Sequence, residues 1–176
     1  MKDGGLIHIY TGDGKGKTTC SLGLCIRCAG HGNKVLFVQF MKGRRTGELE
    51  TLKLIPHIQV LRDKDMVKFS FQMNEEEKSQ LLADHMVLFE KVKNICKSEA
   101  VDLLVLDEIL GAVDKNLFDK ASLIEFLQNK PKGLEIAMTG RNPAPEFLDL
   151  ADYVSEIMMR KHPYTRGIPA REGIER

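Results

Sequence analysis

A loop suited to phosphate binding occupies residues 11–19, which read TGDGKGKTT. It follows an apolar run at 6–10 that indicates a strand, and it precedes a helical pattern at 22–26. Glycines let backbone N–H groups converge on an anion, and the start of a helix adds partial positive charge. Lys17 would supply a cation for the phosphates and Thr18 a hydroxyl ligand for Mg²⁺.

The loop is one residue shorter than the usual phosphate-loop pattern. That pattern has a glycine five residues before the glycine of Gly-Lys-Thr, where this chain has Thr11, and the first glycine here is Gly12. A glycine-rich turn that binds nothing is the alternative interpretation. Because the loop joins a strand to a helix, we favour a phosphate loop of altered shape.

Two carboxylates, Asp107 and Glu108, follow the apolar run at 103–106. Such a pair is the usual partner of a phosphate loop, where one carboxylate ligates Mg²⁺ and the other orients a metal-bound water or a ligand hydroxyl. We expect neighbouring parallel strands to bring both residues beside Thr18. The alternative is an ordinary helix start, because acidic residues are common there.

Two basic segments are expected at the same edge of the sheet. A glycine-bearing loop at 41–47, which contains Lys42, follows the apolar run at 35–40, and Arg141 follows the run at 134–139. Open α/β sheets bind ligands at the carboxyl ends of their strands, so both segments are candidates for the site. The loop could instead be a solvated connector, and Arg141 could form a structural ion pair.

Two pairs of residues are more typical of the hydrophobic core than of a functional site. Cys25 and Cys28 form a C-x-x-C inside the expected first helix, without a second pair at zinc spacing, so we interpret them as buried residues rather than metal or redox groups. Phe69 and Phe71 are aromatics two residues apart, which are more often core than ligand platform.

The elements that would position these residues alternate along the chain. Strands are expected at 6–10, 35–40, 58–61, 102–107, 134–139 and 153–159, and helices from the loop to about 30 and at 48–55, 74–98, 119–128 and 145–151. This alternation predicts one α/β domain over residues 1–176, with a P-loop NTPase-like (RecA-like), open, mostly parallel six-stranded sheet flanked by helices. The polar tail at 160–176 is expected to be loose.

The composition is that of a soluble globular protein. The 176 residues are 43% hydrophobic and 29% charged, with a net charge of +1. This balance gives no reason to expect nucleic-acid binding or membrane attraction, and no apolar stretch approaches the ~20 residues of a membrane span. Because no signal peptide precedes the first expected strand, we expect a cytoplasmic protein.

Several segments agree with one protein family. Besides the short loop they are RCAGHG at 27–32, VQFMKG at 38–43, VLDE at 105–108, TGR at 139–141, the stretch 148–156, KHPY at 161–164 and GIE at 173–175. On these motifs, which span nearly the whole chain, the sequence resembles the corrinoid adenosyltransferases that act on cob(I)alamin and its precursors. The short loop is itself a feature of that family.

The resemblance implies a particular reaction. ATP would bind along the loop in reverse orientation, and the Co(I) of a reduced corrinoid, such as cobalamin or cob(I)yrinic acid a,c-diamide, would attack its 5′ carbon and release triphosphate. Co(I) is the nucleophile, so no protein nucleophile or general base is required. The resemblance also implies Mg²⁺, a homodimer and a flavoprotein reductant.

The resemblance assigns site residues by position. Lys17 and Arg141 would stabilise the leaving triphosphate, and the metal would be held by Thr18 and Glu108 with Asp107 nearby. Lys42, Phe69 and Phe71 would contact the corrinoid, where apolar side chains displace the lower axial ligand of cobalt and ease its reduction. The ATP site would comprise Gly12, Asp13, Gly14, Lys15, Gly16, Lys17, Thr18, Thr19 and Arg27.

Two other functions share part of this pattern. A phosphate-loop ATPase or kinase would also use the loop with Asp107 and Glu108, but it would release ADP and would leave the carboxyl-terminal motifs unexplained. A non-catalytic nucleotide-binding module would bind ATP whether or not corrinoid is present.

Overall fold

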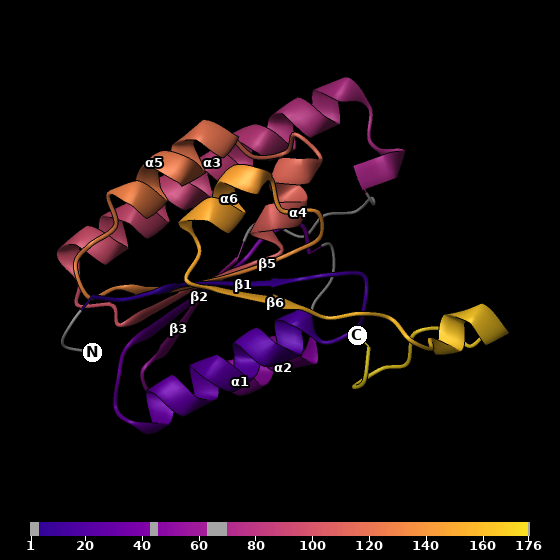
Figure 1. Ribbon diagram of the computed structural model, residues 1–176, viewed down its shortest axis with the longest axis horizontal. Helices are drawn as coiled ribbons and strands as arrows, with labels where there is room; N and C mark the ends of the chain where they lie inside the picture. The colour runs from indigo at the N-terminus through magenta and orange to yellow at the C-terminus, as the bar shows by residue number, and fades with distance from the viewer. Residues whose placement is uncertain (1–3, 43–45, 63–69, 176) are drawn as a thin grey trace.

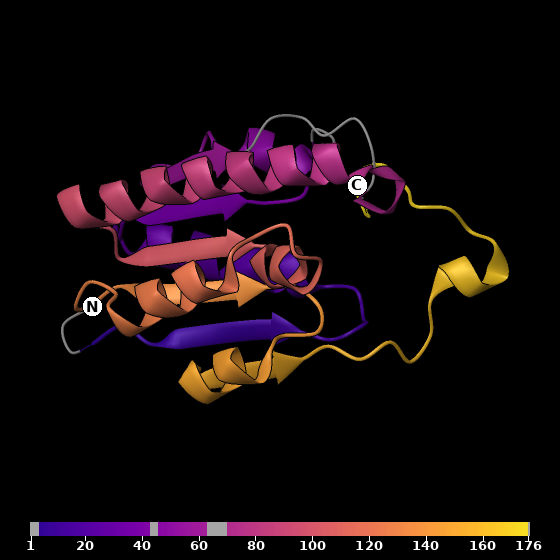
Figure 2. The ribbon, with the colours of Figure 1, turned by 90° about the horizontal axis from the view of Figure 1, so that it is seen from above.

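A six-stranded sheet forms the centre of the computed structural model, which describes residues 4–42, 46–62 and 70–175. Every pair of neighbouring strands is parallel, and Figure 2 shows the arrows pointing the same way. The spatial order is β3-β2-β4-β5-β1-β6. The strands are β1 (Ile7–Thr11), β2 (Val35–Gln39), β3 (Ile58–Arg62), β4 (Leu103–Asp107), β5 (Glu135–Thr139) and β6 (Tyr153–Glu156).

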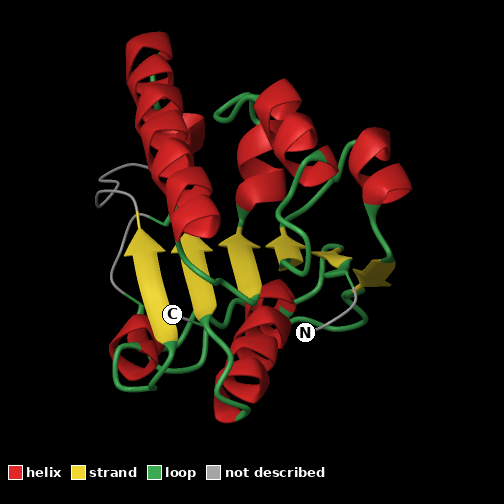
Figure 3. Cartoon of the chain, turned by 90° about the vertical axis from the view of Figure 1, so that its left-hand side faces the viewer, coloured by secondary structure: helices red, strands yellow, loops and turns green. Residues whose placement is uncertain are grey.

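Helices cover both faces of this sheet, which gives three layers (Figures 1 and 3). One face carries α3 (Glu75–Ser98), α4 (Ile109–Asp114), α5 (Lys120–Gln128) and α6 (Pro145–Leu150), and the other carries α1 (Lys17–Gly30) and α2 (Gly47–Leu52). The predicted α/β class with a phosphate-loop arrangement is confirmed, although α4 was not predicted. Within the described residues, no helix is long and apolar enough to cross a membrane.

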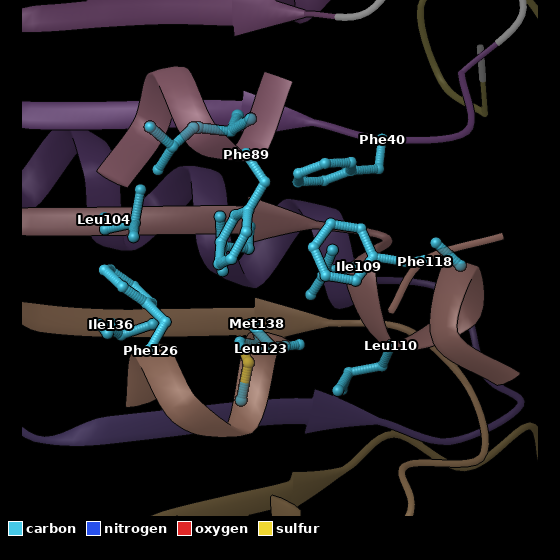
Figure 4. Close-up of a cluster of buried hydrophobic side chains, with 14 of the residues drawn as sticks. Phe40, Phe89, Leu104, Ile109, Leu110, Phe118, Leu123, Phe126, Ile136 and Met138 are labelled. Carbon is cyan, nitrogen blue, oxygen red and sulfur yellow. The ribbon is translucent and has the colours of Figure 1, made fainter. Parts of the chain in front are cut away.

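The core consists of two apolar clusters, one on each face of the sheet. β2 and β4 are buried at every position, which explains their nearly continuous apolar sequences. In the larger cluster Phe89 of α3 meets Phe118 and Phe126 edge-on, with ring centroids 5.0 and 5.3 Å apart (Figure 4). In the smaller cluster Cys25 and Cys28 lie on the buried face of α1, as expected. Both clusters fix the strands whose carboxyl ends carry polar residues.

Two details of the sheet differ from expectation. β5 lies between β1 and β4, so the strands that carry the phosphate loop and the acidic pair are not neighbours. The two motifs still meet because α1 packs across β4 and β5. The sixth strand ends at Glu156 instead of Met159, because the residues that follow leave the sheet and pack on the phosphate loop.

Candidate nucleotide and metal site

The phosphate loop joins the end of β1 to the start of α1. Gly16 is the N-cap residue of α1 with φ 126° and ψ −4°, a conformation that residues with a Cβ rarely adopt. Lys17 begins the helix, and its Nζ donates hydrogen bonds to the carbonyl oxygens of Gly12 and Gly14 at 2.7 and 2.9 Å. The loop therefore holds its own cation at its centre.

The environment of Lys17 disfavours its positive charge. Burial lowers the pKa of Lys17, and the neighbouring Arg141 guanidinium lowers it further. Arg141 lies against the loop, where its Nη2 donates to the carbonyl oxygen of Asp13 at 3.3 Å. Two cations close together in a partly buried loop form a place where a polyanion such as triphosphate is stabilised.

A short segment after β6, residues 157–159, packs against the outside of the loop, and we call it the strap. Gly14 N donates to Ile157 O at 2.7 Å, and Met159 N donates to Asp13 Oδ1 at 2.9 Å. A Cβ placed on Gly12 or Gly14 would lie 2.4 or 2.7 Å from Ile157 O. These two glycines are therefore required for the strap contact, in addition to any role in binding an anion.

Asp107 is fully buried at the end of β4 and is held by three side chains. Its Oδ1 accepts hydrogen bonds from Thr18 Oγ1 at 2.9 Å and from Thr139 Oγ1 at 2.7 Å. Its Oδ2 faces Gln39 Nε2 at 3.3 Å. A buried carboxylate needs such donors, because burial without partners is costly. The Asp107 carboxylate is thus fixed directly beneath the first turn of α1.

Glu108 adopts a left-handed backbone conformation, with φ 62° and ψ 15°. This conformation costs about 1–2 kcal/mol for a residue other than glycine. It is held in place because Glu108 N donates to Thr139 Oγ1 at 2.8 Å. The side chain lies over Gly111, where a Cβ would come within 2.6 Å of Glu108 Oε1. Backbone strain at the end of a central strand is typical of a functional position.

The oxygen atoms at this edge suit a hard cation. Thr18 supplies a hydroxyl, and Asp107 and Glu108 supply carboxylates, which are the ligand types that Mg²⁺ prefers. In the part of the chain that the structure describes, no group of three or more His, Cys, Asp or Glu residues could hold a metal. The hydroxyl and carboxylate oxygens at this edge fit an ion held by one or two protein oxygens together with the phosphates of a nucleotide.

A cavity of about 890 Å³ opens beside these groups. Its walls are the phosphate loop, the start of α2 and the carboxyl-terminal tail, which carries the short helix η2 (Pro163–Arg166). The tail extends from β6 beyond the helical layers in Figures 1 and 2 and then turns back. Arg171 and Glu175 close this turn with a 2.8 Å ion pair, and the hydrogen bond from Arg171 lowers the pKa of Glu175 to about 2. The tail, which was expected to be loose, is a wall of the cavity.

Most of the predicted site residues come together here. The structure places Arg27 in the last turn of α1, about 15 Å along the helix from Lys17, and Arg27 does not line the cavity. Phe69 lies outside the described residues, and only the backbone of Phe71, in η1 (Ser70–Gln72), is described. Asp107 is fully buried and does not line the cavity, and the predicted residues Gly12 and Glu108 do not line it either. The predicted residues that line it are Asp13, Gly14, Lys15, Gly16, Lys17, Thr18, Thr19, Lys42 and Arg141.

Three contributors were not predicted. Gln39 and Thr139 end β2 and β5 and both contact Asp107, while the tail supplies His162 and Tyr164 to the cavity wall. A sequence signal existed for the first two, since each is a polar residue closing an apolar strand. The tail lacks periodicity, so its only sequence signal was the agreement of 161–164 and 173–175 with the family motifs.

Comparison with known proteins finds a family model and relatives that agree with one another. A family model described as ATP:corrinoid adenosyltransferase BtuR/CobO/CobP matches residues 3–176. A corrinoid adenosyltransferase of Sinorhizobium sp is 33% identical over 173 residues, which is 97% of this chain and 80% of the relative. A corrinoid adenosyltransferase of Escherichia coli is 31% identical over 175 residues, which is 97% of this chain and 85% of the relative. The corrinoid adenosyltransferase CobA of Salmonella typhimurium is 33% identical over 179 residues, and the match covers 99% of this chain and 87% of the relative.

Proposed function

The chain belongs to the ATP:corrinoid adenosyltransferase family, and from this we propose that it transfers the 5′-deoxyadenosyl group of ATP to the Co(I) of a reduced corrinoid. The products are adenosylcobalamin, or an adenosylated precursor, and triphosphate. One structural observation supports the proposal: the phosphate loop lines the same cavity as residues of the family motifs at 139–141, 161–164 and 173–175, and Thr18 in its wall donates a hydrogen bond to the buried Asp107.

The chemistry requires little from the protein beyond positioning and charge. The electron pair of Co(I) forms the bond to C5′, while the bond from C5′ to oxygen breaks and its electrons leave with the triphosphate. The leaving group is a polyanion, so its charge is stabilised by Lys17, the loop amides and Arg141. Holding C5′ in line with the corrinoid supplies much of the remaining acceleration.

The same proposal includes Mg²⁺ bound with the triphosphate. Thr18 and Glu108 would hold the ion, and Asp107 would orient Thr18 through the hydrogen bond between them. When bound, the ion neutralises negative charge on the departing phosphates. The remaining residues of the ATP site would be those of the loop together with Arg27.

The corrinoid side of the proposal rests on family resemblance. Lys42 lines the cavity, and Phe69 with Phe71 would lie against the lower face of the corrin. We further propose that residues 1–176 act as one domain, that the protein is a cytoplasmic homodimer, and that a flavoprotein supplies the electron that reduces Co(II). Neither nucleic acid nor membrane enters this scheme.

The decisive experiment is an anaerobic assay with ATP, Mg²⁺ and chemically reduced cob(I)alamin. We expect the Co(I) spectrum to disappear while adenosylcobalamin and triphosphate form in equal amounts. The control omits ATP. Formation of ADP with an unchanged corrinoid spectrum would instead establish an ATPase or kinase, and binding of ATP without any product would indicate a non-catalytic module.

A further inference from the structure

Gln39 is a fully buried glutamine at the end of an otherwise apolar strand. Glutamine is rarely buried, because both ends of its amide must find partners away from water. A valine or leucine would continue β2 at no such cost. The presence of an amide at this position therefore calls for a reason beyond packing.

The amide of Gln39 lies between two carboxylates. Gln39 is in register with Asp107 on the neighbouring strand, so both side chains point to the face that carries α1 and α2. Its Nε2 lies 3.3 Å from Asp107 Oδ2 and 3.5 Å from Glu48 Oε1 of α2. Carboxylates only accept hydrogen bonds, so the NH₂ end must face them.

This orientation leaves the carbonyl oxygen of the amide without a partner. Gln39 Oε1 is buried and accepts no hydrogen bond within the described part of the chain. Thr46 Oγ1, in the wall of the adjoining cavity, is a second buried oxygen of this kind. The unpaired, buried Oε1 of Gln39 costs free energy in the fold alone, and it becomes useful when a donor such as a metal-bound water is present.

We propose that Gln39 is a positioning residue for the metal and triphosphate site. Its amide donates to Oδ2 of Asp107, whereas Thr18 and Thr139 donate to Oδ1. The same amide links the Asp107 carboxylate to Glu48 in the cavity wall. Its Oε1 is the acceptor for a water molecule of the bound ion. The inference rests on the proposed binding of a metal with triphosphate, but not on the transfer of the adenosyl group to a corrinoid.

The test replaces Gln39 by methionine, which keeps the length and volume of the side chain but removes the amide. Binding of Mn²⁺, a paramagnetic substitute for Mg²⁺, is measured by electron paramagnetic resonance in the presence of ATP and without corrinoid. Removing such an outer partner costs about 10–100-fold in metal affinity, so we expect the dissociation constant to rise at least about tenfold. The matched control is Gln59→Met on the neighbouring strand β3, where the side chain is exposed, and it should leave the constant unchanged.

A second variant keeps the test valid if Gln39→Met folds poorly. Glu48→Ala removes the other end of the link from a half-buried position. We expect a smaller rise in the Mn²⁺ dissociation constant than in Gln39→Met. The double variant should have the same dissociation constant as Gln39→Met alone, because both substitutions remove the same contact between Gln39 and Glu48. Unchanged Mn²⁺ affinity in folded Gln39→Met, or additive effects in the double variant, would overturn the proposal. Wild-type protein that binds Mn²⁺ with ATP but adenosylates no corrinoid would refute the proposed function while leaving this inference standing.

Discussion

Replacing Gly14 by alanine tests how the strap supports the phosphate loop. The new Cβ would lie 2.7 Å from Ile157 O, which is closer than real Cβ atoms approach a backbone oxygen. The obstacle is backbone, so it cannot rotate away as a flexible side chain would. The strap must therefore move, and its 2.7 Å hydrogen bond from Gly14 N must lengthen or break.

The magnitude follows from these two effects. Loss of the hydrogen bond costs about 1 kcal/mol. Overpacking typically costs about 1–3 kcal/mol. A total loss of about 3 kcal/mol in the free energy of unfolding lowers Tm by about 6–12 °C for a chain of this size. The affinity for ATP should fall as well, since the loop changes shape.

The assay is thermal unfolding followed by circular dichroism, with ATP affinity measured by calorimetry. The control is Gly23→Ala, the same substitution in the interior of α1, where no atom lies within 4 Å of the new Cβ. Alanine is favoured over glycine there by about 0.5–1 kcal/mol, so this variant should be slightly stabilised. Wild-type stability and ATP affinity in Gly14→Ala would refute the contact between strap and loop.

Three further predictions concern other groups. Lys17→Ala should abolish turnover mainly through lost triphosphate binding, measured by calorimetry with ATP, and near-normal activity would disprove the loop assignment. Thr139→Val removes a donor to Asp107 and an acceptor for a backbone N–H, so denaturant unfolding should show a loss of about 2–4 kcal/mol; a loss below about 0.5 kcal/mol would contradict the network. Burial raises the pKa of Cys25 to about 12 and that of Cys96 to about 11, so at pH 8 these thiols stay protonated and unreactive. Exposed Cys20 should react first with a thiol reagent, and equally fast labelling of all three would show that the buried thiols are accessible.

The sequence predicted the sheet well because its strands are short, apolar and bounded by polar residues. Each predicted strand corresponds to an observed one, and the helix predicted at 74–98 is observed at Glu75–Ser98, where Asn74 and Glu77 form a capping box. The helix α4 was missed because it is only six residues long and follows the acidic pair without a break. Its start depends on the left-handed conformation of Glu108, which the tertiary contact with Thr139 stabilises and local sequence does not encode.

The candidate site could be predicted only where a local motif marks it. The loop and the acidic pair are such motifs, whereas Gln39 and Thr139 contribute through the register of neighbouring strands. Strand order is a property of the whole chain, and the insertion of β5 between β1 and β4 could not be read from either segment. The strap is a similar case, since its partners lie almost 150 residues earlier.

The place of β1 in the sheet has a consequence for how the protein matures during synthesis. β1 is translated before the other five strands, yet both of its neighbours, β5 and β6, are the last two strands to be translated. Until those strands emerge, the first strand has no partner and the loop after it has no strap. A growing chain can pair β2, β3 and β4 early, but the long-range pairing of β1 must wait. The candidate nucleotide site is therefore among the last parts to form, so incomplete chains should fail to bind ATP even when much of their core is present.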